Sequence, residues 1–299
     1  MNIKAWLSAM RLRTLPLTLS SVGMASFLAA KYAAFRWDIF VLCVLTTVFL
    51  QILSNFANDY GDSINGADNA ERKGPQRAVQ SGLISPKAMM KGIIMLSSLS
   101  LFSGMLLLYI ALQQSTRETI LVFFGLGLLS IVAAITYTAG KKPYGYAGLG
   151  DLAVIIFFGW VGVLGTFYLF THQFNMLLIL PATSCGLFAT AVLNVNNIRD
   201  IESDEKAGKR SVPVRIGRKN ATLYHWVLLG GGLLCAIMYV VYTYTDLWQF
   251  LFAITIPLFL INAIGIYKKQ QPKELDPYLK QMALTSLSFM ITFGIGQLL

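Results

Sequence analysis

The sequence has 299 residues, of which 56% are hydrophobic and only 13% are charged, against roughly 25% charged in soluble domains. A chain this apolar could not cover a water-facing surface with polar groups, so a soluble globular protein is excluded. The net charge of +10 would suggest a nucleic-acid partner in a soluble protein. Here we expect no nucleic acid, because the positive charges follow a membrane pattern.

Apolar runs of the length that crosses a bilayer, about 20 residues each, recur along the whole chain. They predict an all-α membrane bundle of about nine transmembrane helices, forming a single domain over residues 1–299 within a lipid bilayer. The predicted spans lie near residues 15–30, 38–56, 89–112, 119–137, 152–170, 174–194, 222–243, 247–267 and 281–298.

Basic residues divide the loops between these spans into two classes. Nearly all of the 24 Lys and Arg residues fall in the N-terminal segment and in every second loop after it; the exceptions are Lys31, Arg36 and Arg117. Positively charged loops stay cytoplasmic in membrane proteins. We therefore predict a multi-pass protein of the cytoplasmic membrane, with its N-terminus and the basic loops in the cytoplasm.

Two of these cytoplasmic loops also concentrate asparagines and carboxylates, after the second and the sixth predicted span. The first acidic motif comprises Asn58, Asp62 and Asp68. The second acidic motif comprises Asn197, Asp200 and Asp204. If the helices continue to these points, spacings of three and four place the side chains on one helix face. The recurrence divides the chain into two halves, about 1–145 and 146–299.

Clustered like charges repel one another, so a structural role explains these carboxylates poorly. A divalent cation reverses that repulsion, and Mg²⁺ prefers a few carboxylates, waters and substrate phosphates as ligands. Basic side chains stand close to both motifs, and Arg, Lys and Mg²⁺ together stabilise a diphosphate leaving group. The predicted metal ligands are Asp62, Asp68, Asp200 and Asp204.

These residues resemble the intramembrane aromatic prenyltransferases of the UbiA superfamily. That family has nine transmembrane helices, requires Mg²⁺ and carries two Asp-rich motifs on the cytoplasmic side, after helices two and six. Gly66 stands where the common form of the first motif has its second aspartate, and the acid follows at Asp68. This departure fits the naphthoate branch. The similar stretches are Asn58–Asp68, Gly74–Arg77, Tyr137–Asp151 and Asn197–Arg210.

The resemblance implies transfer of a prenyl group from a prenyl diphosphate to an aromatic acceptor, 1,4-dihydroxy-2-naphthoate, with loss of the ring carboxylate as CO₂. It implies catalytic roles for Asp62, Asp200 and Asp204. Asp151 would orient or deprotonate the acceptor, with a helix-capping role equally open. The implied diphosphate-binding residues are Asn58, Lys73, Arg77, Lys142, Asn197 and Arg199.

Three alternatives remain open at this point. Another aromatic acceptor, such as 4-hydroxybenzoate, would keep the family and change the substrate. A cation-coupled transporter would use the acidic residues as an ion pathway, since carboxylates within membrane segments often mark such function. A lipid phosphotransferase would also need clustered aspartates and Mg²⁺, but no loop carries a compact Asp-x-x-Asp-Gly run with a following Ala-Arg.

Overall fold

The computed structural model describes residues 2–68, 74 and 76–299. All regular structure in this part of the chain is helical, which confirms the predicted all-α class. The α-helices are α1 (Ile3–Met10), α2 (Leu15–Lys31), α3 (Trp37–Ile64), α4 (Pro86–Ala111), α5 (Arg117–Thr136), α6 (Gly150–Val154), α7 (Thr166–Thr171), α8 (Ile179–Arg199), α9 (Ile201–Lys206), α10 (Val212–Tyr242), α11 (Ile256–Lys268) and α12 (Asp276–Leu298). Shorter segments are η1 (Leu12–Thr14), the π-helical η2 (Ile155–Gly165), η3 (Met176–Leu178), η4 (Leu247–Thr255) and η5 (Pro272–Leu275).

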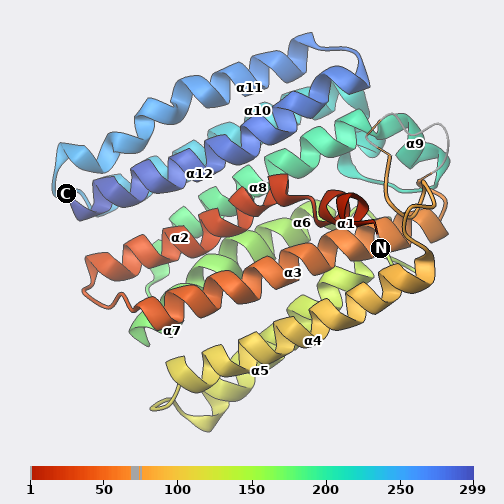
Figure 1. Ribbon diagram of the computed structural model, residues 1–299. Coiled ribbons are helices and arrows are strands. Elements are labelled where there is room, and N and C mark those ends of the chain that lie inside the picture. Colours follow the sequence, from red (N-terminus) through yellow and green to blue (C-terminus); the bar gives the residue numbers. More distant parts are fainter. Residues whose placement is uncertain (1, 69–73, 75) are drawn as a thin grey trace.

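The long helices lie side by side along one direction, with α4 and α5 at one edge of the bundle and α11 at the other (Figure 1). α8 packs against α10, α2 against α12, and α3 against α4. One large apolar core joins α2, α8, α10 and α12, and a second, smaller core joins α1, α3 and α4. The bundle therefore has two packed parts.

Seven helical segments among the described residues are long and apolar enough to cross a membrane. They are Trp37–Ile64, Pro86–Ala111, Arg117–Thr136, Gly150–Thr171, Met176–Arg199, Val212–Tyr242 and Leu247–Lys268. The first and last predicted spans correspond to α2, which has 17 residues, and to α12. The chain is a multi-span membrane protein, and the number nine stays a prediction.

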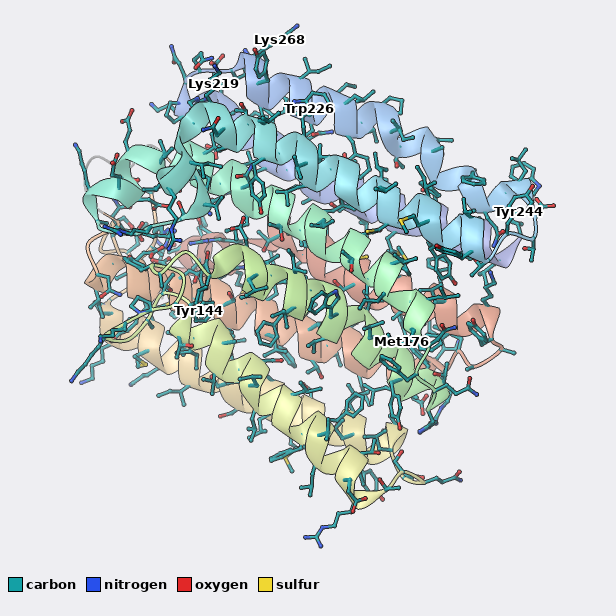
Figure 2. The ribbon with its side chains drawn as sticks, turned by 180° about the vertical axis from the view of Figure 1, so that it is seen from behind. Tyr144, Met176, Lys219, Trp226, Tyr244 and Lys268 are labelled. Carbon is teal, nitrogen blue, oxygen red and sulfur yellow. The ribbon has the colours of Figure 1, made fainter. Side chains whose placement is uncertain are left out.

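Apolar side chains cover the outside of the bundle, as a lipid environment requires. On α5, Leu121, Val122 and Leu129 are more than half exposed. Polar atoms instead gather at one end, where Tyr144 and Lys219 lie, whereas Tyr244 and Met176 mark the opposite end (Figure 2). The N-terminus and α9 lie at the polar end and the C-terminus lies at the other (Figure 1).

A close backbone contact builds the polar end. α3 continues beyond its apolar part to Ile64, so Asn58 and Asp62 lie on the helix itself. At Gly61 the helix touches the loop that follows α5: an added Cβ would lie 2.5 Å from the carbonyl carbon and oxygen of Thr138. Only glycine allows this approach, which brings the 137–151 loop over the end of α3.

Candidate active site

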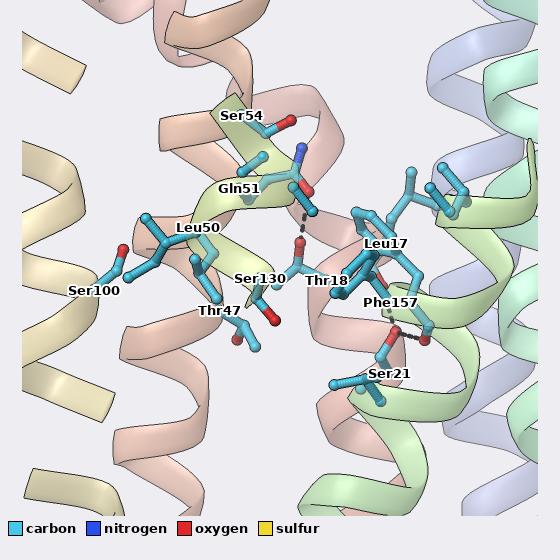
Figure 3. A pocket seen from close by; sticks show the side chains of 18 of the residues that line it. Leu17, Thr18, Ser21, Thr47, Leu50, Gln51, Ser54, Ser100, Ser130 and Phe157 are labelled. Carbon is cyan, nitrogen blue, oxygen red and sulfur yellow. Dashed lines mark hydrogen bonds between the residues drawn. The ribbon is translucent and has the colours of Figure 1, made fainter. Parts of the chain in front are cut away.

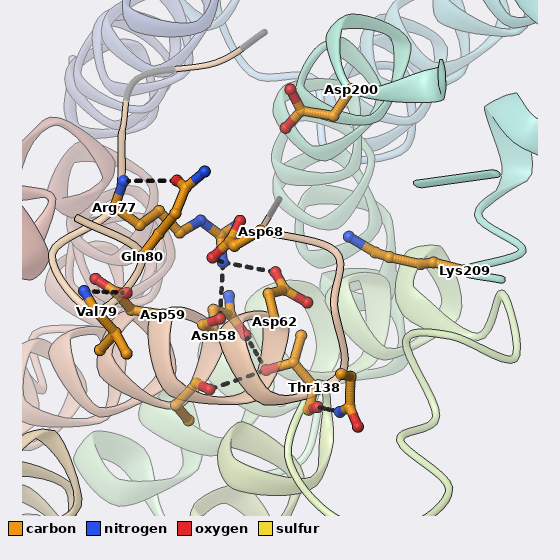
Figure 4. A network of polar contacts seen from close by, with 12 residues as sticks. Asn58, Asp59, Asp62, Asp68, Arg77, Val79, Gln80, Thr138, Asp200 and Lys209 are labelled. Carbon is orange, nitrogen blue, oxygen red and sulfur yellow. Dashed lines mark hydrogen bonds and ion pairs between the residues drawn. The ribbon is translucent and has the colours of Figure 1, made fainter. Parts of the chain in front are cut away.

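The carboxylate of Asp62 is held on two sides. Its Oδ2 accepts a hydrogen bond of 2.6 Å from Arg77 Nη1, and its Oδ1 accepts one of 2.9 Å from the hydroxyl of Tyr146. Arg77 Nη1 also donates to the backbone carbonyl of Asn58, at 2.7 Å, and lies 3.1 Å from Asp68 Oδ2. One guanidinium thus joins the carboxylates of the first acidic motif (Figure 4).

Asp59 has a different role from its neighbour Asp62. Its two carboxylate oxygens accept hydrogen bonds of 3.1 Å from the backbone N–H groups of Ala78 and Val79. Asp59 is 1% exposed, so these two bonds satisfy a fully buried charge. They fix the segment that carries Arg77, and Asp59 therefore positions the site without facing it.

At the second acidic motif, Arg199 orients Asp200. Its Nε and Nη2 donate to Asp200 Oδ1 and Oδ2, at 2.9 and 2.7 Å, in a two-pronged pair. Nη1 donates to Asp276 at 2.6 Å and Nη2 also to Asn196 at 2.8 Å. An added Cβ on Gly74 would come within 3.0 Å of this guanidinium, so the loop after the first motif touches the second.

Asp204, on the short helix α9, is 3% exposed and faces Lys209. The Lys209 ammonium lies 3.3 Å from Asp204 Oδ1. Burial raises the pKa of Asp204 to about 6, and the charges of Asp200 and Asp62 act in the same direction, whereas Lys209 lowers it. Burial alone lowers the pKa of Lys209, but Asp204 and Asp62 outweigh it and hold that pKa above its ordinary value.

The two motifs face one another across a short gap. Arg77 interacts electrostatically with Asp62 and Asp68 and also with Asp200 of the other motif. Lys209 interacts with Asp204 and with Asp62. Figure 4 shows the Lys209 side chain pointing from its own loop toward Asp62 and Asp68, with Asp200 on the facing helix. The structure therefore brings the first and second acidic motifs together at one end of the bundle.

These residues fit a divalent cation that takes its remaining ligands from a bound substrate. No cluster of three or more His, Cys, Asp or Glu side chains already gathered for a metal occurs in the part of the chain that the structure describes. However, Asn197 Oδ1 and Asp204 Oδ2 are buried without a hydrogen-bond partner. Mg²⁺ is commonly held by one or two carboxylates with waters and substrate phosphates, and such oxygens suit it.

A cavity of about 390 Å³ extends from the acidic motifs into the bundle, between α2, α3, α4, α5, η2 and α8. This lies within the range of small-molecule sites, about 300–1,000 Å³. Asn58, Asp62, Asn197 and Lys209 line its polar end. The apolar lining includes Leu17, Leu50, Leu101, Phe123, Phe124, Phe157 and Phe158.

A polar patch lines the cavity below the acidic motifs (Figure 3). Gln51 accepts a hydrogen bond of 2.9 Å from the Thr18 hydroxyl and donates one of 3.1 Å to Thr14. Asn55, one turn above on α3, donates to Thr14 and to the carbonyl of Met10. Because Gln51, Asn55, Asn58 and Asp62 follow one another at spacings of three and four, one polar stripe of α3 runs from the motif into the cavity.

Two predicted site residues, Asp151 and Lys142, are not brought to this cluster. Asp151 lies in the first turn of α6 and accepts a hydrogen bond of 2.9 Å from Tyr224; it neither caps the helix nor lines the cavity. Lys142 is exposed and lies outside the cavity lining. Lys73 lies outside the described residues. The roles of all three stay predictions.

The structure places at the site three side chains that the motifs do not predict: Lys209, Tyr146 and Gln51. In the sequence, Lys209 is one of several basic residues after the second motif. The charge pattern of the loops does not separate Lys209 from its exposed neighbours. What distinguishes Lys209 is the glycine before it: Gly208 has a φ of +72° and turns the chain back, so that the Lys209 N–H donates to the Asp204 carbonyl at 2.8 Å.

Comparisons with known proteins agree with this arrangement. The sequence profile of the UbiA prenyltransferase family matches residues 18–287. The chain is 47% identical to a 1,4-dihydroxy-2-naphthoate octaprenyltransferase from Haemophilus influenzae, over 100% of this chain and 97% of the relative. It is 42% identical to the enzyme of the same name from Escherichia coli, over 98% and 96%. A solved UbiA homolog from Archaeoglobus fulgidus, bound to DMAPP and Mg²⁺, shares the fold with a TM-score of 0.61 at 15% identity, covering 97% of this chain and 99% of that one.

Proposed function

Because the chain belongs to the UbiA prenyltransferase family, we propose that it transfers a polyprenyl group from a prenyl diphosphate to 1,4-dihydroxy-2-naphthoate. The ring carboxylate leaves as CO₂ and the product is demethylmenaquinol, an intermediate of menaquinone synthesis. The observation that carries the proposal is the pair of acidic motifs facing one another at the mouth of an apolar cavity. The names of the two similar enzymes support this acceptor.

The reaction would use Mg²⁺. The carboxylates that would hold it are those of Asp62 and Asp68 from the first motif and of Asp200 and Asp204 from the second. Asn197 Oδ1, buried and without a hydrogen-bond partner, adds a neutral oxygen. When bound, Mg²⁺ neutralises charge that develops on the leaving diphosphate.

The basic residues near the two motifs have different proposed roles. Arg77, buried between Asp62 and Asp68, pairs with both carboxylates and holds them in place at the site. Arg199 positions Asp200, because its Nε and both N–H groups of Nη2 donate to Asp200 and Asn196. Nη1 uses one of its two N–H groups on Asp276, so among the bonds of the described residues one N–H is left for an oxygen of the diphosphate. Lys73 remains a proposed diphosphate contact. Lys142, which is exposed and outside the cavity lining, would attract the diphosphate from a longer distance.

The cavity protects from water the allylic cation that remains when the diphosphate leaves. An allylic cation is short-lived in water, and an apolar, aromatic lining excludes water and stabilises positive charge. Phe157 and Phe158 from η2, and Phe123 and Phe124 from α5, provide such a lining. The polar patch of Thr18 and Gln51 offers hydrogen-bonding groups for the hydroxyls of the acceptor.

We place the acidic motifs and the N-terminus on the cytoplasmic side of the cytoplasmic membrane, because the basic loops lie at that end. Both substrates would then reach the polar end from the cytoplasm or from the lipid. The two acidic-motif halves, about 1–145 and 146–299, form a single catalytic domain, since residues of both motifs line one cavity.

An acceptor panel tests the substrate assignment. Purified protein in lipid would be given Mg²⁺, a prenyl diphosphate and either 1,4-dihydroxy-2-naphthoate or 4-hydroxybenzoate, and the prenylated products would be identified by mass. We expect product from the naphthoate alone. Product from 4-hydroxybenzoate in its place would keep the family and overturn the acceptor.

A further inference from the structure

Lys209 is held in an unusual place for a lysine. It is 5% exposed, lines the polar end of the cavity and comes from the loop after α9. The left-handed turn at Gly208 directs it back toward its own helix. The next residue, Arg210, donates its backbone N–H to the carbonyl of Tyr146 at 2.9 Å, which anchors this loop on the 137–151 loop. The backbone therefore fixes the direction of the side chain.

The ammonium group is only partly satisfied. An ammonium can donate three hydrogen bonds, and the one that Lys209 forms with the described residues is a long contact of 3.3 Å to Asp204 Oδ1. It also faces the ring of Tyr146, whose centroid lies 5.9 Å away, and interacts electrostatically with Asp62, Tyr137 and Arg77. A buried ammonium with unused donors costs free energy unless another acceptor is bound there.

The position of Lys209 differs from those of the other buried cations. Arg77 donates to Asp62 and to the Asn58 carbonyl, and Arg199 donates to three side chains at 2.6–2.9 Å. Lys209 instead stands between a carboxylate of each motif, Asp62 and Asp204, where a divalent cation would also be attracted. Two cations that share the same carboxylates compete for them.

We propose that Lys209 is a mobile counter-ion of the two acidic motifs, which pairs with Asp204 and Asp62 before loading and donates to an oxygen of the magnesium-bound diphosphate afterwards. The inference deepens the proposed function and rests on it. A flexible four-carbon stem with a rotating ammonium suits such an exchange, whereas a rigid guanidinium fork suits a fixed pair. Lys209 therefore weakens metal binding in the substrate-free protein and strengthens diphosphate binding in the loaded one.

Two binding measurements on the full-length protein in detergent test this. The first titrates Mg²⁺ alone by calorimetry. The second titrates geranyl thiolodiphosphate, an unreactive diphosphate probe, in the presence of Mg²⁺. For Lys209→Met we expect Mg²⁺ alone to bind several-fold more tightly, because a competing positive charge is gone. We expect the diphosphate probe to bind ~10-fold or more weakly, because a charge-assisted hydrogen bond is lost.

The opposite changes that we expect in the affinities for Mg²⁺ and for the probe separate this role from a structural one. If both affinities fall, or the affinity for the probe is unchanged, Lys209 is a structural residue and the proposal is overturned. Lys209→Gln repeats the test with a polar side chain if the Met variant does not fold. Lys209→Arg keeps the charge and should recover part of the probe affinity. Lys219→Met, at an exposed lysine of α10, is the matched control and should change neither value.

Failure of the inference and failure of the proposed function give different results. A wild-type protein that binds the probe with Mg²⁺, and a Lys209→Met variant that binds it equally well, would overturn only the role of Lys209. A wild-type protein that does not bind the probe at all would overturn both.

Discussion

The two acidic motifs look like repeats in the sequence, but the structure treats them differently. In the first, Asp62 is bonded to Arg77 and Tyr146, Asp68 is paired with the same arginine, and Asp59 is saturated by backbone N–H groups. In the second, Asp200 is held by Arg199, whereas Asp204 Oδ2 and Asn197 Oδ1 are buried without a hydrogen-bond partner.

This difference indicates that the two motifs have different roles in binding. A carboxylate that is already hydrogen-bonded is pre-oriented and costs little to bring into a site, whereas an unpartnered buried oxygen gains most when a ligand arrives. We infer that the first motif provides ligands that are already oriented, and that the second motif provides the oxygens that gain a partner when the metal and the diphosphate bind.

The largest effect should come from removing a carboxylate of either motif. Asp62→Asn and Asp200→Asn each remove a charge that holds the metal, and we expect turnover to fall by at least ~10³-fold, since several kcal/mol of transition-state stabilisation depend on the metal. Initial rates of diphosphate release from purified protein measure this. The exposed Asp246→Asn, at the far end, is the control, because Asn also caps a helix well. An active Asp200→Asn enzyme would remove the second motif from the metal site.

A smaller loss should follow when Arg199 stops orienting Asp200. Arg199→Gln removes a two-pronged pair, and groups that orient metal ligands are typically worth ~10–100-fold in affinity or activity. We expect that range in the apparent affinity for Mg²⁺, measured from the metal dependence of the rate. Asp276→Ala is the matched variant: it loses one hydrogen bond while Arg199 keeps Asp200, so its effect should be several-fold smaller. Equal effects would argue that Arg199 serves the attachment of α12 and not the site.

Asp59 should act on stability more than on catalysis. Asp59→Ala leaves the buried N–H groups of Ala78 and Val79 without an acceptor, which lowers the free energy of unfolding by roughly 1–3 kcal/mol. Thermal unfolding in detergent measures the loss. Asp38→Ala, which removes an exposed ion pair at the other end of α3, should cost less than ~1 kcal/mol. A variant as stable as the wild type would remove the distinction between Asp59 and Asp62.

The smallest effect is expected at Lys142. This lysine is exposed and outside the cavity, so its contribution is a screened, long-range attraction. Lys142→Met should raise the KM for the prenyl diphosphate by less than ~3-fold, close to the effect of Lys141→Met beside it. A tenfold loss confined to Lys142 would instead establish the direct diphosphate contact that the sequence predicts.

Much of the fold and part of the candidate site can be predicted from the sequence alone. Hydropathy and charge predict the helical bundle, and the spacing of Asn58 and Asp62 predicts their shared face because α3 does continue to Ile64. The side-chain pairing could not be predicted. Lys209 and Lys142 both lie in basic loops, and only the turn at Gly208 buries one of them. The partners of Asp59 lie about twenty residues away, in a loop whose path depends on tertiary packing.

The most direct test measures two products of a single reaction. Wild-type protein in lipid, with Mg²⁺, a prenyl diphosphate and 1,4-dihydroxy-2-naphthoate, should release diphosphate and CO₂ in equal amounts, and EDTA should stop both. This result would tie the metal, the acidic motifs and the acceptor to one site. Unchanged release in EDTA, or no release from a folded sample with any acceptor, would contradict the account.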